Sequence, residues 1–236
     1  MLIALLLALA PPSSPLPSFE VASVKRAGAD TDLNPKYEPM FDPRSGRFNC
    51  NSTLGEIIEA AYSVHGWEFS APDWVKSERY AITALAPPRT TKKNSGLMVR
   101  RVLEERFKIQ VHYEDREQET YVLVRGRGKL KLPAAKTGAV ENYDFTLGHF
   151  AGIAPMSAFA AAVGGFLGRT VVDQTGYKGL YVFQVSWAKD IPGFVPGEGQ
   201  TTYLRAAGFL GMKMEMRKAS FPFLVVDSIE KEPTAN

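Results

Sequence analysis

The sequence predicts an α+β protein made of two similar halves, each built from two helix–strand–strand units with mainly antiparallel sheets. Three observations predict this class: four segments with helical apolar spacing, extended segments after each of them, and near-equal distances between corresponding aromatic residues. Of the 236 residues, 45% are hydrophobic and 22% are charged, which is the composition of a globular chain. One cysteine excludes a disulfide framework, and a net charge of +3 is too small to indicate nucleic-acid binding.

The first predicted helix begins at Thr53. Apolar residues recur from Leu54 onward at spacings of three and four, while Glu56 and Glu59 fall on the opposite side. Thr53 and Glu56 also have the spacing of a capping box, in which each side chain binds a free backbone N–H of the other residue. Extended segments are expected on both sides of this helix, at 19–25, 47–51, 67–70 and 79–86.

The same order of one helix and two strands recurs three more times. The further helices are predicted at 97–107, 156–167 and 202–211. The strands that follow them are predicted at 108–114 and 120–125, at 169–173 and 180–187, and at 212–216 and 221–229. Tyr80 and Tyr181 lie 101 residues apart, and Tyr121 and Phe223 lie 102 residues apart. This near-equality indicates two halves of one plan, and the alternative is that any α+β chain shows some such order by chance.

The chain is expected to divide into four parts. These are a signal peptide with a Pro/Ser leader at 1–18, a first half at 19–125, a linker at 126–142 and a second half at 143–236. The apolar run at 2–10 is too short to cross a bilayer but has the length of a signal-peptide core. We therefore expect a secreted or periplasmic protein that is at most peripheral to the membrane, the alternative being an uncleaved tail or a misassigned start.

Motifs that carry catalysis or bind metals are missing from the sequence. His65, His112 and His149 lie in different units, without the spacing of zinc ligands. The chain has no nucleophile elbow, no phosphate-binding loop and no dinucleotide fingerprint. We therefore expect no catalytic residue, no metal and no cofactor, with Cys50 serving as a small buried hydrophobic residue.

The candidate ligand-binding residues are three aromatic and three basic side chains: Trp67, Phe69, Trp74, Arg125, Arg127 and Lys129. The aromatic residues lie close together in a loop-rich segment, where exposed rings favour binding. Their alternative role is to close the core beneath a loop. The basic residues stand in the run RGRGK after a predicted strand, where they could contact an anionic envelope polymer. The alternative for these is a solvated hairpin end.

Several blocks of sequence carry a family resemblance. GRFNCNSTLGEIIEAAY, PDWVKSERYAITALAP, LEERFKIQVHYEDREQETYVLV and GRTVVDQTGYKGLYVFQVSW follow one another along the chain. In combination they resemble a large, uncharacterised secreted-protein family abundant in Solibacter and other Acidobacteria. That family is a domain of unknown function without an assigned catalytic residue. The fusion of some relatives to membrane metallopeptidase sensors implies an extracytoplasmic sensing or binding role.

Two functions from different classes remain open. The first is a non-catalytic secreted or periplasmic binding or interaction module, whose sheet edges offer β-augmentation to a partner. Its partner would be an envelope protein or a cell-surface glycan, and not a nucleic acid. The alternative is an envelope hydrolase or transferase that acts on cell-wall or polysaccharide material through carboxylates brought together from distant units.

Overall fold

A computed structural model describes residues 16–27, 37–146, 149–188, 201–202, 207–208 and 210–234. The chain divides into two compact units. Unit 1 comprises residues 1–66, 71–112 and 226–236, and unit 2 comprises 67–70 and 113–225. These units differ from the two consecutive halves expected from the sequence, because a short early segment belongs to unit 2 and the C-terminal end belongs to unit 1. The stretch 126–142, expected to be a linker, lies within unit 2.

Unit 1 contains a four-stranded sheet in which all described pairs are antiparallel. The strands lie in the order β1 (Val21–Arg26), β5 (Arg79–Leu85), β3 (Arg47–Thr53) and β2 (Tyr37–Asp42). On the central strands, Phe48, Cys50, Tyr80 and Ile82 share one face and are all buried. Residues between them are more exposed, as in a sheet covered on one side.

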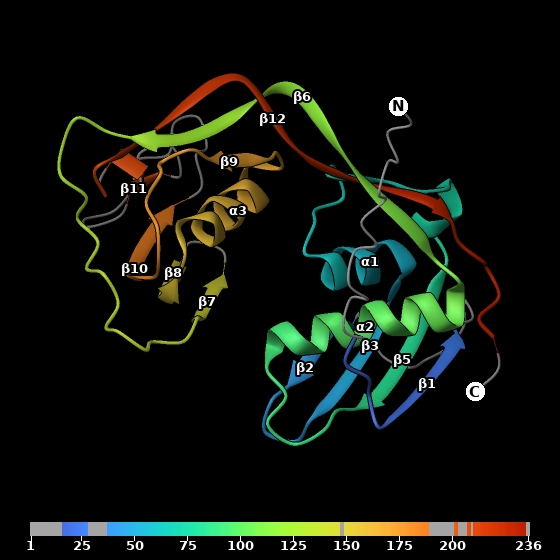
Figure 1. The fold of residues 1–236 in the computed structure, drawn as a ribbon. Helices are drawn as coiled ribbons and strands as arrows, with labels where there is room; N and C mark the ends of the chain where they lie inside the picture. The colour runs from blue at the N-terminus through green and yellow to red at the C-terminus, as the bar shows by residue number, and fades with distance from the viewer. Residues whose placement is uncertain are drawn as a thin grey trace, which may run out of the picture. The chain divides into compact units, whose positions relative to one another are not determined.

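Two helices cover the buried face of this sheet (Figure 1). The predicted capping box of α1 (Leu54–Tyr62) is confirmed, with Thr53 Oγ1 accepting from the Glu56 N–H at 3.2 Å and the Glu56 carboxylate accepting from the Thr53 N–H at 3.0 Å. Helix α2 (Lys92–Phe107) begins five residues before the predicted start, since Thr91 caps it. Its first turn is polar, so apolar spacing does not reveal it.

Unit 2 contains a second four-stranded sheet and the helix α3 (Met156–Leu167), at its predicted position. The strand order is β11 (Thr201–Thr202), β10 (Tyr181–Ala188), β8 (His149–Ala154) and β7 (Asn142–Thr146). Phe159 of α3 packs on Phe150 and Phe183 of the sheet, with ring centroids 5.5 and 5.3 Å away. The core of unit 2 forms around these rings.

A third sheet joins segments that are distant in sequence. Its order is β4 (Phe69–Ser70), β12 (Met212–Ser228), β6 (Gln110–Arg125) and β9 (Val171–Asp173). The short outer strands are both parallel to their neighbours. In the other two sheets the one described parallel pair is β10 with β11, so the structure confirms the α+β class with mainly antiparallel pairing.

Three details of the predicted units are corrected by the structure. The strand pairs expected at 108–125 and at 212–229 are single long strands, β6 and β12. The charged stretch in the middle of β6 resembles a loop in sequence, yet it contains no glycine or proline to end the strand. The hairpin strands β7 and β8 were not predicted, because Gly152 interrupts the alternation of β8. Also, β4 pairs with β12 and β9 with β6, so these strands do not form antiparallel pairs with the strands that follow them.

The structure does not confirm the predicted internal repeat, which stays a prediction. Both halves run strand, helix, short strand, long strand, as β3-α1-β4-β5 and as β8-α3-β9-β10. The fourth predicted helix, at 202–211, falls largely outside the described residues, as does most of the predicted signal peptide and leader at 1–18.

Candidate binding surface

The basic segment, residues 125–131, follows β6 in unit 2 and is held in place by its backbone. The Gly126 N–H donates to the Gly211 carbonyl at 3.0 Å, and the Lys131 N–H donates to the Leu210 carbonyl at 2.9 Å. Gly211 has a φ of 85°, and a Cβ there would lie 2.3 Å from the Lys129 carbonyl oxygen, so this close approach requires glycine. The segment is therefore a fixed part of unit 2.

The side chains of the basic segment alternate between the core and solvent. Leu130 packs against the core of unit 2, whereas Arg127 and Lys129 are exposed. Five basic residues and no acidic residue lie between positions 125 and 140. Among the described residues, neither Arg127 nor Lys129 forms an ion pair. Arg127 and Lys129 thus present positive charge that no carboxylate in the described part of the chain neutralises.

Arg125 is exposed but held in one orientation. Its Nε donates to the Thr175 carbonyl at 2.6 Å, an Nη donates to the Gly176 carbonyl at 3.4 Å, and its guanidinium carbon lies 4.5 Å from the centre of the Tyr177 ring. Only two of the five guanidinium N–H groups are used by these hydrogen bonds. The remaining donors are free of any carboxylate among the described residues. Arg125 is therefore preorganised to accept an anion.

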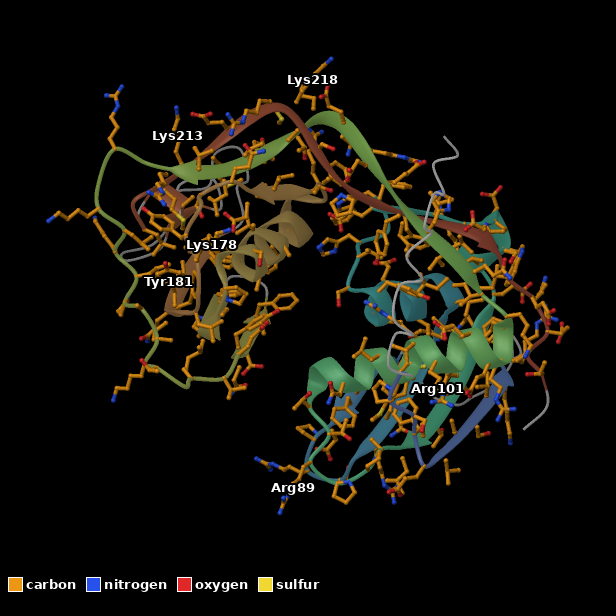
Figure 2. The ribbon with its side chains drawn as sticks, viewed as in Figure 1. Arg89, Arg101, Lys178, Tyr181, Lys213 and Lys218 are labelled. Carbon is orange, nitrogen blue, oxygen red and sulfur yellow. The ribbon has the colours of Figure 1, made fainter. Side chains whose placement is uncertain are left out.

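Tyr177, whose ring contacts Arg125, lies beside a second tyrosine, Tyr181. The rings of Tyr177 and Tyr181 are half-buried, and their centroids lie 6.2 Å apart at an interplanar angle of 68°. The Tyr181 hydroxyl donates to the Lys178 carbonyl at 3.1 Å, and Figure 2 shows these two residues side by side. The cation–aromatic surface consists of Arg125, Arg127, Lys129, Tyr177, Lys178 and Tyr181.

Sequence reasoning found only the basic half of this surface. The tyrosines and Lys178 stand about 50 residues further along the chain, in QTGYKGLY, and the parallel pairing of β9 with β6 brings the turn after β9 to Arg125. Asp173 shapes that turn, since its Oδ1 accepts from the Thr175 N–H at 2.9 Å and from the Thr175 hydroxyl at 2.8 Å. The sequence signal that could have revealed these residues is the presence of tyrosines in and directly after a stretch with two glycines typical of turns.

The predicted aromatic residues have different surroundings. Phe69 lies in β4 opposite Leu224 and is buried, so its side chain contributes to packing. Trp67 precedes it in unit 2 and is 36% exposed. Trp74 belongs to unit 1, in the 3-10 helix η1 (Asp73–Lys76), and its ring lies 5.9 Å from Lys231 Nζ. Of the three predicted aromatic residues, Trp67 is the most exposed ring.

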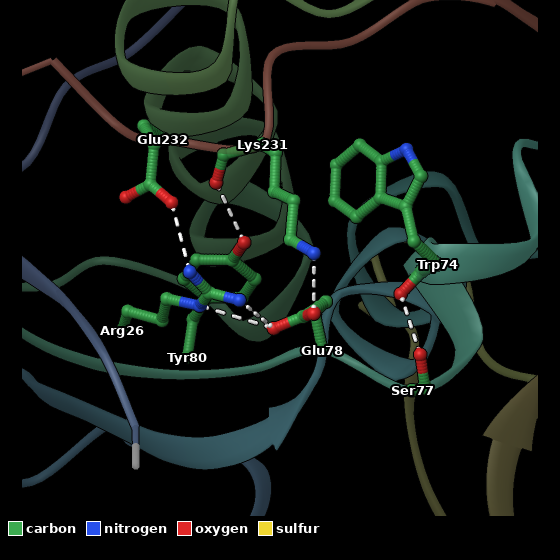
Figure 3. A network of polar contacts seen from close by, with 7 residues as sticks. All are labelled: Arg26, Trp74, Ser77, Glu78, Tyr80, Lys231 and Glu232. Carbon is green, nitrogen blue, oxygen red and sulfur yellow. Dashed lines mark hydrogen bonds and ion pairs between the residues drawn. The ribbon is translucent and has the colours of Figure 1, made fainter.

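A second charged cluster, the Glu78 network, lies in unit 1 (Figure 3). The Glu78 carboxylate lies 2.6 Å from Arg26 and 2.5 Å from Lys231, and Arg26 also contacts Glu232 at 2.9 Å. The Tyr80 hydroxyl donates to the Lys231 carbonyl at 2.6 Å. Hydrogen bonds from Lys231 and Arg26 lower the pKa of Glu78. Because a general acid needs a raised pKa, this carboxylate does not fit the general-acid role in the hydrolase alternative.

The histidines and the cysteine also have defined environments. His112 Nδ1 lies 2.8 Å from Asp227, and both side chains are about half exposed. His112 is therefore partly exposed to solvent and lies beside a carboxylate. Burial raises the pKa of the Cys50 thiol to about 12, so this thiol stays protonated at neutral pH. In the part of the chain that the structure describes, no group of three or more His, Cys, Asp or Glu side chains is arranged to hold a metal ion.

Comparisons with known proteins identify a family, but no function is described for that family. A family model described as "Protein of unknown function (DUF3738)" matches residues 55–229. Neither the search of curated proteins nor the search of solved structures found a match. The matched range includes the cation–aromatic surface but only Glu78 and Tyr80 of the Glu78 network.

Proposed function

Because the chain belongs to the DUF3738 family, for which no function is described, we propose a function from its own surface chemistry. The protein is a non-catalytic binding module that works outside the cytoplasm, and the cation–aromatic surface of unit 2 binds its ligand. The observation that carries this proposal is Arg125, which is exposed, oriented by three contacts and unpaired with any carboxylate of the described residues. It supplements two exposed cations that are likewise without an ion-pair partner there.

The fixed orientation of Arg125 and the positive charge of its neighbours both favour an anionic ligand. Holding a long side chain in one orientation costs conformational entropy, and here the structure meets that cost before any ligand arrives. Neighbouring cations without counter-ions attract anions and speed their association, more strongly at low ionic strength. A ligand with several negative charges therefore fits the surface better than a neutral one.

Export from the cytoplasm is part of this proposal. Its support is the apolar run at 2–10, followed by a Pro- and Ser-rich stretch. Among the described residues, no helix is long and apolar enough to cross a bilayer. Mass spectrometry of protein recovered from the envelope should find a start between Pro11 and Phe19, and an intact N-terminus would contradict export.

We include the internal repeat in the proposal. The pairings of the short strands support it: in the first half β4 pairs with β12 of the second half, and in the second half β9 pairs with β6 of the first. Each half thus supplies a strand to the other in the same way. An experimental structure in which the two halves superpose in chain order would be the test, and an unrelated arrangement of β5 and β10 would contradict it.

The binding function is tested with dextran sulfate as a polyanion probe. The double variant Arg127→Gln/Lys129→Gln removes two positive charges from the surface, and Lys25→Gln/Lys76→Gln removes two from exposed positions of unit 1. We expect the first pair to weaken binding about tenfold or more and the second to change it less than twofold. Equal losses would mean that only net charge matters, and absence of binding by the wild type would refute the proposal.

A further inference from the structure

We propose that the ligand of the cation–aromatic surface is an acidic polysaccharide, meaning a linear sugar polymer that carries carboxylates. This inference rests on the proposed binding function and names the chemistry of its ligand. Three features of the surface lead to it: the close spacing of the cations along one segment, the geometry of Arg125, and the tyrosine rings.

The order of the cations fits a polymer. Arg125, Arg127 and Lys129 are exposed at every second position of one chain segment, whose backbone is tied to Gly211 and Leu210. After the basic segment, the Pro133 carbonyl accepts from the Val182 N–H of β10 at 2.9 Å, which fixes the chain there beside β10. Three exposed cations within five residues of a fixed backbone attract a ligand that carries several negative charges along one chain.

The geometry of Arg125 fits a carboxylate. A planar guanidinium binds a carboxylate through two parallel N–H···O bonds, and stacking on Tyr177 fixes the plane of this guanidinium. Acidic side chains of the flanking strands are already engaged. Asp173 of β9 accepts from Thr175, and Glu215 of β12 is paired with Lys213 at 3.0 Å. The carboxylate that accepts from the remaining N–H groups of Arg125 would therefore come from the ligand.

The tyrosines distinguish a sugar polymer from other polyanions. Tyr177 and Tyr181 are half-buried and contact each other, so little side-chain entropy is lost when a ligand packs on them. A sugar ring has C–H faces that pack on an aromatic ring while its hydroxyl and carboxylate groups remain available to Arg125 and Lys178. Inorganic polyphosphate has charge but no apolar face, so it would bind the cations without using the rings.

The test measures binding of polygalacturonate and of inorganic polyphosphate by the full chain, with neutral amylose as a control polymer. Tyr181→Leu keeps an apolar side chain in β10 and leaves the Arg125 contacts intact. We expect this variant to bind polygalacturonate about fivefold more weakly and to bind polyphosphate as the wild type does. Arg127→Gln/Lys129→Gln should weaken the binding of both polyanions, and amylose should not bind. Thermal melting confirms that each variant is folded.

The outcomes separate the two proposals. If Tyr181→Leu leaves polygalacturonate binding unchanged, or weakens the binding of both polyanions equally, the acidic polysaccharide is refuted while the binding function stands. Binding of amylose as tight as that of polygalacturonate would also refute it, since carboxylates would then contribute nothing. Should the wild type bind neither polyanion, both the ligand class and the binding function are wrong.

Discussion

The Glu78 network of unit 1 and the basic segment of unit 2 use their cations in opposite ways. In the network, Arg26 and Lys231 contact Glu78 at 2.6 and 2.5 Å, and Arg26 also contacts Glu232. In the basic segment, Arg125 contacts backbone carbonyls and a ring, and Arg127 and Lys129 have no ion-pair partner among the described residues. The chain neutralises the cations of the first cluster, whereas Arg127 and Lys129 of the second have no ion-pair partner among the described residues, and we propose that a ligand binds there.

The two clusters also differ in how they are held within the fold. The network connects distant parts of the sequence. Glu78 directly precedes β5 and Tyr80 lies in it, whereas Lys231 and Glu232 follow β12. It therefore holds the C-terminal segment to the rest of unit 1. The basic segment is held by its backbone and by Leu130 instead, so the charges of Arg127 and Lys129 are not needed to maintain its shape.

The largest effect on stability should come from the apolar core and not from either charged cluster. Phe159 is fully buried and contacts Phe150, Phe183 and Trp187. Phe159→Ala should lower the free energy of unfolding by about 3–5 kcal/mol, because it removes buried apolar surface and leaves a cavity. Denaturant titration followed by tryptophan fluorescence measures this loss. Phe145→Ala, at a residue that is 50% exposed, is the control and should cost far less.

A smaller loss is expected from the hydroxyl of the Glu78 network. Tyr80 is buried, and its hydroxyl donates to the Lys231 carbonyl. Tyr80→Phe keeps the ring packed edge-on against Phe107 and removes only this hydrogen bond. The expected loss is about 1 kcal/mol by denaturant titration. Unchanged stability would show that the C-terminal segment is not held by this contact.

The pH dependence of stability should depend on Glu78. Hydrogen bonds from Lys231 and Arg26 lower its pKa in the folded protein, so its stabilising contribution is complete above the unfolded-state pKa of about 4.3. That contribution is lost as the pH falls through the lower, folded-state pKa. Glu78→Gln should therefore be less stable than the wild type at pH 7, and the difference should shrink on acidification. Urea titrations at pH 7 and pH 3 measure it, and a difference independent of pH would contradict the account.

The smallest effect should come from the basic segment. Arg127→Gln/Lys129→Gln changes two exposed side chains without ion-pair partners among the described residues, so the free energy of unfolding should stay within about 0.5 kcal/mol of the wild-type value. A large loss would mean that these cations stabilise unit 2, which would remove the contrast with the Glu78 network.

Local patterns in the sequence were sufficient for the helices α1 and α3 and for the α+β class, whereas the start of α2 was predicted five residues too late. Apolar spacing and the capping box placed α1 correctly, and α3 begins and ends where its apolar run does. Long-range pairing was not predictable in this way. The parallel contacts of β4 with β12 and of β9 with β6 join residues about 155 and 50 positions apart, and side-chain periodicity does not specify the partner of a two- or three-residue strand.

The candidate site shows the same limit. RGRGK identified Arg125, Arg127 and Lys129 because clustered charge is visible within a short window of sequence. Tyr177, Lys178 and Tyr181 join them only through the pairing of β9 with β6, so no local signal connects the two groups. Phe69 shows the reverse case, since an aromatic residue close to two tryptophans in sequence is buried in a strand.

The most direct test of the contrast between the two clusters is to map the bound ligand by nuclear magnetic resonance. Amide resonances of the isotope-labelled full chain are followed while a short oligogalacturonate is added at low ionic strength. We expect the largest shifts at residues 125–131 and 175–181, and little change at Arg26, Glu78 and Lys231, whose charges are already paired. Shifts concentrated at the Glu78 network, or spread evenly over exposed cations of both units, would contradict the claim that the basic segment is the binding surface.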